Sequence, residues 1–411
     1  MAAASRHRRD SHFAVTLPDR YDALVVGAGP AGSAVAAHLA RRGARVALLE
    51  SKRHPRDKPC AEYASPRIAE ELAALGLVPD AWADAALALD GMRIIRGDTA
   101  FDLRYERRER QRSAWGLDRK RFDALLAAHA GASGAHLLQE TALTELLRSD
   151  AGRDGGRVTG ALVRHRNGRR RAIHADEVIC ADGARSLTSR LLGVEREVAF
   201  PRRLGLVAHY SGVAGLERSG EMHIGHRLYI GLAPTPGGEM NVGMALPLDR
   251  APRPAVAAFE AAIASLPAVA RRLTGSRRLT AIRGSAPIGH RVARTAGPGW
   301  LLIGDAAGFI DPFTGEGIYR ALRSARAAAA ALLSTDPAAA YVAERRRAFA
   351  AKDALTWLVQ GMLATSPLLA YATRRLASRP SAARTLGSAL GDLRPATDAL
   401  APRALLSVLR P

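Results

Sequence analysis

The chain has 411 residues, of which 48% are hydrophobic and 24% charged, a balance typical of a globular protein with more than one core. No run of about 18 uncharged apolar residues occurs, so no transmembrane helix is expected. Two cysteines, Cys60 and Cys180, are too few for a disulfide framework or a Cys/His metal site, which favours a cytoplasmic location. The net charge of +21 comes from scattered arginines without a nucleic-acid-binding motif, so we expect no nucleic-acid partner. An anionic membrane surface is the alternative interpretation of this charge.

Residues 1–18 start with a basic, polar stretch that lacks the apolar segment of a secretory signal, and we expect a disordered tail. A buried strand is predicted at 21–26, a helix of small residues at 30–42, and a second buried strand at 45–49. A strand, a helix and a strand within about thirty residues have the size of a βαβ unit.

A glycine-rich turn joins this first strand to the helix. Gly27, Gly29 and Gly32 form the pattern GxGxxG, and Glu50 closes the second strand. The first glycine permits a tight turn, the second lets the backbone approach a pyrophosphate, and the third lets helix and strand pack closely. The helix N-terminus offers free N–H groups to phosphates, and Glu50 is expected to bind the adenosine ribose. This context predicts a dinucleotide site.

The rest of the chain changes character twice. Further helices and buried strands are predicted at residues 65–75, 119–130, 177–181, 301–303 and 317–333. Between them, residues 203–246 alternate between apolar and polar and are rich in glycine, which is typical of an antiparallel sheet. From residue 339 the chain consists of amphipathic helices broken by Pro367, Pro380 and Pro395.

Further motifs follow the dinucleotide turn. KPCAEYASPR surrounds Cys60, a helix begins at Arg119, Asp182-Gly183 follows one strand, and Gly304-Asp305 follows another and leads into DPFTGEGI at 311–318. With these motifs in this order, the chain resembles FAD-dependent oxidoreductases of the para-hydroxybenzoate hydroxylase fold. It is most similar to the branch that holds geranylgeranyl reductases and UbiH-like monooxygenases. The resemblance covers roughly residues 20–335; one departure is Ala61, where the family usually has glycine.

The resemblance implies a role for each motif. Arg119 would contact the cofactor, Asp305 would contact the flavin ribityl chain, and the helix from Gly317 would direct its N-terminal dipole at the flavin pyrimidine ring. Because only one GxGxxG is present, NAD(P)H is expected as a transient electron donor without a Rossmann unit of its own. The residues expected to bind FAD are Gly27, Gly29, Pro30, Ala31, Gly32, Glu50, Ser51, Cys60, Ala61, Arg119, Ala142, Asp182, Gly183, Gly304, Asp305, Pro312, Gly315, Gly317 and Ile318.

The expected fold is α/β, with a Rossmann-type FAD-binding domain on a parallel sheet, an inserted α+β substrate domain on an antiparallel sheet, and C-terminal helices. The FAD-binding domain is expected to be discontinuous and to consist of three segments, residues 19–91, 116–196 and 284–335. The C-terminal helices are expected to cover residues 336–411. The substrate domain is expected to comprise residues 92–115 and 197–283.

Several reactions are compatible with this resemblance. The favoured hypothesis is an NAD(P)H-dependent monooxygenase that hydroxylates a hydrophobic aromatic or polyketide-like molecule of secondary metabolism. It is favoured because residues 229–243 are similar to strands of UbiH-like enzymes of secondary metabolism. Prenyl reductases also usually carry a YxWxFP-like segment there, and this chain lacks its tryptophan. The alternative is a geranylgeranyl- or menaquinone-type prenyl reductase, which the Cys60 segment and the 311–318 run fit. A dehydrogenase, a halogenase-like enzyme and a non-enzymatic flavin-, lipid- or nucleic-acid-binding protein are less favoured.

Candidate catalytic residues are Cys60, His209 and Tyr229. Cys60 is expected near the flavin, whereas His209 and Tyr229 lie on the predicted substrate sheet, where a general base could activate a phenol. The apolar segment 355–371, flanked by Lys352 and Arg374, is interpreted as a helix packed against the two lobes. A membrane-surface helix that delivers a hydrophobic substrate is the alternative.

Overall fold

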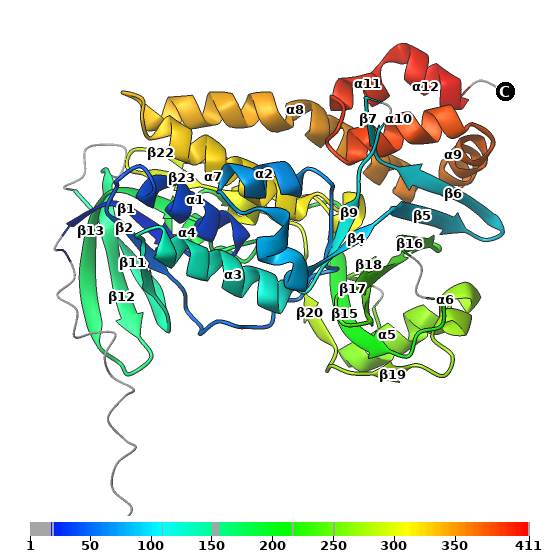
Figure 1. The fold of residues 1–411 in the computed structure, drawn as a ribbon, viewed down its shortest axis with the longest axis horizontal. Helices are drawn as coiled ribbons and strands as arrows, with labels where there is room; N and C mark the ends of the chain where they lie inside the picture. Colours follow the sequence, from blue (N-terminus) through cyan, green and yellow to red (C-terminus); the bar gives the residue numbers. More distant parts are fainter. Residues whose placement is uncertain are drawn as a thin grey trace, which may run out of the picture.

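The computed structural model describes residue 18 and residues 20–108, 110–149, 156–215, 218–249 and 251–409. The tail expected at 1–18 therefore lies, apart from Pro18, outside the described residues. The N-terminal two thirds form two sheet-containing lobes, and the C-terminal helices lie across the junction between them (Figure 1).

The first lobe is built on a parallel sheet in the order β10–β2–β1–β13–β23. These strands cover His136–Leu138, Val46–Leu49, Arg20–Val26, Arg170–Cys180 and Trp300–Leu302, respectively. In this register Val26 lies beside both Leu49 and Cys180, and Cys180 lies beside Leu302. The loops that follow these strands therefore leave the sheet at one edge, which is where α/β proteins bind ligands.

Helices cover one face of this sheet, and an antiparallel extension continues it on the other side of β13. The helices that pack against each other on this face are α1 (Pro30–Ala40), α2 (Ile68–Ala74), α3 (Arg119–Ala132) and α7 (Gly317–Ala331). Helix α1 is buried from Pro30 to Leu39 because its alanines and Gly32 let it pack between the sheet, α3 and α7. The extension consists of β11 (Thr141–Arg148) and β12 (Val158–His165), which pairs with the first half of β13.

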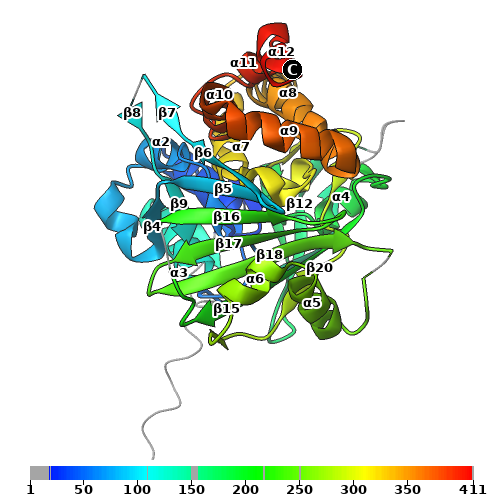
Figure 2. The same cartoon turned by 90° about the vertical axis from the view of Figure 1, so that its right-hand side faces the viewer.

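The second lobe is a largely antiparallel sheet in the order β19–β15–β18–β17–β16–β5–β6, with β20 also on β15. These strands cover Arg277–Arg278, Arg203–Ser211, Glu239–Pro247, Tyr229–Thr235, Ser219–Ile224, Gly91–Arg96, Thr99–Arg104 and Arg283–Ser285, respectively. Helices α5 (Ala255–Ala264) and α6 (Pro267–Arg272) pack on its outer face (Figure 2). A small sheet of β3 (Tyr63–Ala64), β9 (Ala114–Leu117) and β4 (Ala86–Leu89) joins the lobes.

The C-terminal region is helical, and prolines start its helices. The helices are α8 (Pro337–Ala364), α9 (Ser366–Ser378), α10 (Pro380–Leu390), α11 (Ala396–Leu400) and α12 (Pro402–Leu409). Pro367 and Pro380 stand in the first turns of α9 and α10, where the missing N–H costs nothing, and Pro395 precedes α11. Helices α9 and α10 pack on β6, so apolar side chains from both regions share one core. Within the described ranges, none of the helices has the length and apolar character needed to cross a bilayer.

The expected fold class is confirmed, including the parallel sheet, the antiparallel second sheet and the helical C-terminus. The apolar segment 355–371 belongs to α8 and α9, and Lys352 precedes it on α8. The Lys352 side chain is buried, and its ammonium donates hydrogen bonds to the carbonyls of Ala389 and Leu390.

Candidate functional site

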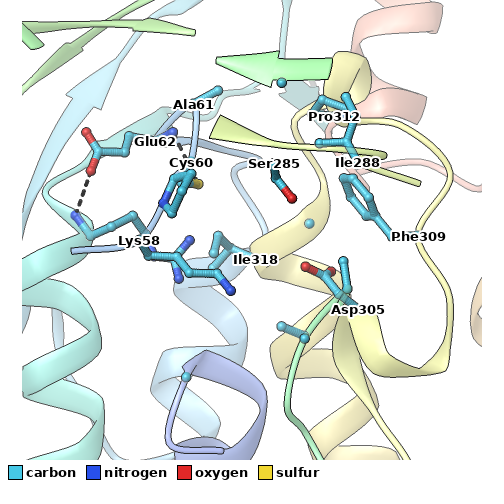
Figure 3. A pocket seen from close by; sticks show the side chains of 18 of the residues that line it. Lys58, Cys60, Ala61, Glu62, Ser285, Ile288, Asp305, Phe309, Pro312 and Ile318 are labelled. Carbon is cyan, nitrogen blue, oxygen red and sulfur yellow. Dashed lines mark hydrogen bonds between the residues drawn. The ribbon is translucent and has the colours of Figure 1, made fainter. Parts of the chain in front are cut away.

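A cavity of about 660 Å³ lies at the carboxyl edge of the parallel sheet and continues between the two lobes (Figure 3). Charged and glycine residues of the first lobe line one half, which we call the dinucleotide half. Apolar side chains of the second sheet line the other, which we call the apolar half. The volume falls within the range of small-molecule and cofactor sites, roughly 300–1,000 Å³.

The three motif glycines have different structural roles in the turn between β1 and α1. Gly27 has a φ of +101°, and a Cβ there would lie 2.6 Å from the Ala181 carbonyl oxygen. A Cβ at Gly32 would lie 1.8 Å from the Gly27 carbonyl oxygen. Gly29 faces the cavity, where a Cβ would meet only the end of the Arg56 side chain, at 3.7 Å. Gly27 and Gly32 therefore shape the turn, and Gly29 leaves its N–H side open to a ligand.

Glu50 ends β2 at the rim of the dinucleotide half. Its carboxylate accepts the Lys52 N–H at 3.0 Å and the Ser51 hydroxyl at 3.3 Å, and lies 3.1 Å from the Arg56 guanidinium. Arg56 also reaches Asp123, at 3.5 Å. The carboxylate is thereby held rigidly at the end of the strand, as a group that recognises a ribose requires.

Arg119 begins α3, and its guanidinium is paired with Asp123 one turn later, at 2.8 and 2.9 Å. Burial lowers the pKa of Arg119, but Asp123 and the Cys60 thiol outweigh that effect and raise it. Asp118 caps the helix by accepting the N–H groups of Lys120 and Arg121, which explains why α3 starts here. Arg119 is thus a permanent cation beside Cys60 at the cavity.

Asp182-Gly183 and Gly304-Asp305 follow β13 and β23. The Asp182 carboxylate accepts the N–H and hydroxyl of Thr188, so it caps helix α4 (Leu187–Leu191). The Asp305 carboxylate points into the cavity (Figure 3). Burial raises the pKa of Asp305, and the nearby Lys58 ammonium opposes the rise. Gly304 does not line the cavity; its φ is +57°, and a Cβ there would lie 2.9 Å from the Cβ of Ala31.

The 311–318 run forms a turn at the start of α7. Asp311 accepts the Phe313 N–H at 3.0 Å, and Gly315 adopts a left-handed φ of +68°. The Thr314 hydroxyl lines the cavity and is buried without a hydrogen-bond partner. The N-terminus of α7, at Gly317 and Ile318, also faces the cavity. These free donors and the unpartnered hydroxyl fit a polar ring system bound beside them.

The structure brings the predicted cofactor residues together at one cavity. All of them line it except Gly32 and Gly304, which pack behind it. The open face of Gly29, the unpartnered Thr314 hydroxyl and the anion-attracting start of α1 together fit a flavin dinucleotide.

The three catalytic candidates differ in their relation to the cavity. Cys60 lines it beside Arg119. Tyr229 also lines it, but its hydroxyl donates to the Asp311 carboxylate at 2.6 Å, and burial raises its pKa well above 10. His209 lies behind the cavity wall, where its Nε2 is 2.6 Å from the Glu62 carboxylate. Only Cys60 therefore presents a reactive group to the cavity without an evident competing carboxylate partner.

Sequence reasoning did not identify several groups at this site. Arg56 and Lys58 place cations in the dinucleotide half, and Glu62 links Arg119 to His209 and Asn241. The basic loop 51–59 was a signal for Arg56 and Lys58 because it directly follows the strand that Glu50 closes. No local pattern marks Asn241, whose side-chain N–H₂ bridges Glu62 and the Cys60 carbonyl at 3.0 and 2.9 Å.

This fold and this cavity define a flavin-dependent enzyme, and comparison with known proteins agrees. The family model described as FAD binding domain matches residues 20–346, so the chain belongs to that family. It is an FAD-dependent oxidoreductase.

Among curated proteins, the menaquinone reductase of Mycolicibacterium smegmatis is 30% identical over 332 residues, which is 77% of each chain. The digeranylgeranylglycerophospholipid reductase of Methanosarcina mazei is 29% identical over 327 residues, 76% of this chain and 75% of that one. Among solved structures, a geranylgeranyl bacteriochlorophyll reductase-like protein from Thermoplasma acidophilum has a TM-score of 0.78 and 22% identity, covering 94% of this chain and 98% of that one. A flavin-dependent brominase reaches the same TM-score at 21% identity, covering 91% and 94%. The two structural likenesses show the fold alone.

Proposed function

We propose that the protein is an FAD-dependent prenyl reductase that saturates a double bond in the isoprenoid chain of a hydrophobic substrate. The observation that carries the proposal is the apolar half of the cavity, which opens directly from the dinucleotide half. The relatives named menaquinone reductase and digeranylgeranylglycerophospholipid reductase support it. They favour this alternative over the monooxygenase that the sequence alone suggested.

FAD would lie across the dinucleotide half. Gly29 and the start of α1 would bind its pyrophosphate, Glu50 its ribose and Asp305 its ribityl chain. The unpartnered Thr314 hydroxyl and the N-terminus of α7 would bind the flavin ring edge and stabilise negative charge there. Arg56 and Lys58 would neutralise the phosphates.

When bound and reduced by NAD(P)H, FAD would supply the hydride for one carbon of the double bond, and a proton from the solvent would complete the saturation. The protein's part is to hold an apolar chain against the flavin and to keep water out. Met92, Ile94, Leu103 and Met222 line the apolar half with side chains that can adapt to a prenyl chain. These side chains belong to the second sheet and share a buried apolar cluster with Ala389 and Leu390 of α10, so the substrate chain would lie against an apolar wall.

The mass of the product formed without oxygen, compared with that formed in its presence, tests the proposal. The purified holoenzyme is reduced with dithionite without oxygen and mixed with a naphthoquinone that carries a two-unit prenyl chain. A reductase adds two hydrogens to the chain, which raises the mass by about two units; the product is first reoxidised in air, because reduction of the quinone ring to the quinol adds the same mass. Anaerobic inactivity combined with oxygen uptake and a hydroxylated product would establish the monooxygenase instead. Anaerobic bleaching of the flavin by NADPH or NADH, in parallel, identifies the electron donor.

We also propose that the C-terminal helices contact a membrane surface, from which a hydrophobic substrate could be taken. Trp357, Leu358 and Leu368 expose 46%, 37% and 40% of their surface on α8 and α9, and Arg374 on α9 is also exposed. Apolar and basic side chains together favour anionic lipid surfaces. Flotation with phosphatidylglycerol vesicles should recover the wild type and lose Trp357→Ser/Leu358→Ser. Leu333→Ser, which removes an exposed leucine elsewhere, should float like the wild type.

A further inference from the structure

Two tyrosine hydroxyls meet at the wall of the apolar half. Tyr63 on β3 and Tyr105 after β6 lie 42 residues apart in the chain, and their hydroxyl oxygens are 2.7 Å apart. Both side chains line the cavity, and Tyr105 is only 3% exposed. The pair therefore stands at the substrate side of the site.

Glycines fix where these rings lie. A Cβ at Gly315, in the turn before α7, would lie 2.7 Å from the Tyr63 ring, and a Cβ at Gly220, on β16, would lie 3.0 Å from it. A Cβ at Gly391 would lie 2.5 Å from the Tyr105 ring. Tyr63 is thus held between the turn proposed to contact the flavin and the substrate sheet. The pair lies where the two halves of the cavity meet.

The hydrogen-bond count leaves one donor free. Two phenols carry two protons, but the bond between them uses only one. Among the described residues, no other group accepts a hydrogen bond from either hydroxyl. Burial raises the pKa of Tyr105 to about 12 and that of Tyr63 well above 10, so both phenols stay protonated at neutral pH. A buried donor without an acceptor is costly, by about 1–3 kcal/mol, unless a ligand satisfies it.

The surroundings exclude a charged ligand group. The cavity-lining residues that the second sheet contributes, within the described ranges, carry no charged side chain. The negative charge of the Asp392 carboxylate contributes to the raised pKa of Tyr105. This carboxylate is itself paired with the Lys352 ammonium at 2.9 Å. The Lys352 ammonium is already shared between Glu316 and Asp392, so it does not serve a phosphate, and a second anion beside Asp392 would be repelled.

We propose that Tyr63 and Tyr105 form a subsite that donates a hydrogen bond to a neutral carbonyl oxygen of the substrate. This inference rests on the proposed reductase function and narrows its substrate to a prenylated carbonyl compound of the quinone type. Prenyl diphosphates are excluded because the subsite offers one neutral donor and no cation. The pair fixes the head of the substrate, and the apolar half holds its chain.

Binding to the oxidised holoenzyme, without turnover, tests the subsite. Three probes are titrated against the flavin absorbance spectrum: the naphthoquinone with a two-unit prenyl chain, the naphthalene with the same chain, and geranylgeranyl diphosphate. In the wild type the quinone should bind about tenfold more tightly than the naphthalene, as one net hydrogen bond predicts. Tyr63→Phe/Tyr105→Phe should lose this tenfold advantage and bind the naphthalene unchanged. The double variant is needed because a single one leaves a free hydroxyl.

Tyr210→Phe is the matched control, because this tyrosine lies on β15 of the second sheet and does not line the cavity. If the double variant loses affinity equally for quinone and naphthalene, the two tyrosines only pack against the substrate, and the subsite is overturned. If the double variant does not retain flavin, the wild-type series decides: equal binding of quinone and naphthalene, or tighter binding of the diphosphate, overturns it. Tyrosine-dependent quinone binding without chain reduction would refute the reductase function and leave the subsite standing.

Discussion

The Lys352 ammonium and the Glu316 carboxylate form a buried ion pair, with 3.3 Å between Nζ and Oε2 and each side chain only 5% exposed. Glu316 directly precedes α7, whose N-terminus faces the cavity, and Lys352 belongs to α8. The same ammonium pairs with Asp392 at 2.9 Å, beyond α10. One cation therefore ties the C-terminal helices to the turn that we propose contacts the flavin.

Replacing Lys352 by Met should strongly destabilise the protein. The substitution leaves Glu316 and Asp392 buried without their cation, which typically costs about 3–5 kcal/mol in the free energy of unfolding. Urea denaturation followed by circular dichroism measures the loss. Arg347→Met on the same helix is the control, since the Arg347 side chain is 77% exposed and a change within about 0.5 kcal/mol is expected there. Similar losses for both variants would contradict a special role for Lys352.

Alanine substitutions should separate the glycines of the turn before α1. In Gly32→Ala the new Cβ would lie 1.8 Å from a backbone oxygen, so the apoprotein should unfold more easily. In Gly29→Ala the Cβ meets only a flexible arginine, so apoprotein stability should hold while FAD affinity falls about tenfold or more, roughly 1.4 kcal/mol. Thermal melting of the apoprotein and FAD titration by fluorescence quenching measure the two effects. Unchanged FAD affinity in Gly29→Ala would argue against a pyrophosphate at this turn.

The two cysteines should react differently with thiol reagents. Cys60 lines the cavity, whereas Cys180 is fully buried and burial raises the pKa of its thiol. One thiol per chain should therefore react in the native apoprotein and two in denaturant. FAD should protect the native thiol, and Cys60→Ser should abolish the native reaction. A thiol that reacts equally fast with and without FAD would place the cofactor away from Cys60.

The sequence could indicate which segments line the candidate site because the signals of these segments are local. Residues 21–26 and 30–42 were predicted as a strand and a helix, and the structure has them at Arg20–Val26 and Pro30–Ala40. The glycine and aspartate motifs each follow a strand of one parallel sheet, so strand order alone brings them to one edge.

The substrate side could not be predicted in the same way. Tyr63 and Tyr105 meet through the packing of β3 against β9 and of β6 against α10. Tyr63 belongs to the KPCAEYASPR segment, but nothing in that segment indicates Tyr105 as its partner. The preference for a monooxygenase rested on residues 229–243, because they are similar to UbiH-like strands and lack the tryptophan of prenyl reductases. Which substrate a cavity admits depends on side chains from many separate segments, and a single segment therefore decided too much.

Glu62 and His209 lie 147 residues apart in the chain, and the hydrogen bond between their side chains is a second long-range contact that can be tested. The hydrogen bond to the Glu62 carboxylate raises the pKa of His209 above its usual 6.5, against the effect of burial. A group whose folded pKa is raised stabilises the fold fully below its unfolded pKa and loses that contribution as pH rises through the folded pKa. The contribution of His209 should therefore be complete below about pH 6.5 and should disappear at higher pH.

The measurement compares wild type with His209→Asn by urea denaturation between pH 5.5 and pH 9. The stability difference between the two should be largest at the acidic end and should shrink as pH rises above 6.5, because only the protonated imidazole is a cation opposite Glu62. Glu62→Gln keeps the shape of the partner but not its charge, so in that background His209→Asn should show little dependence on pH. Nuclear magnetic resonance titration of the His209 ring gives the pKa directly. A stability difference that grows with pH, or a pH dependence that survives in the Glu62→Gln background, would show that His209 is held by packing and not by its charge.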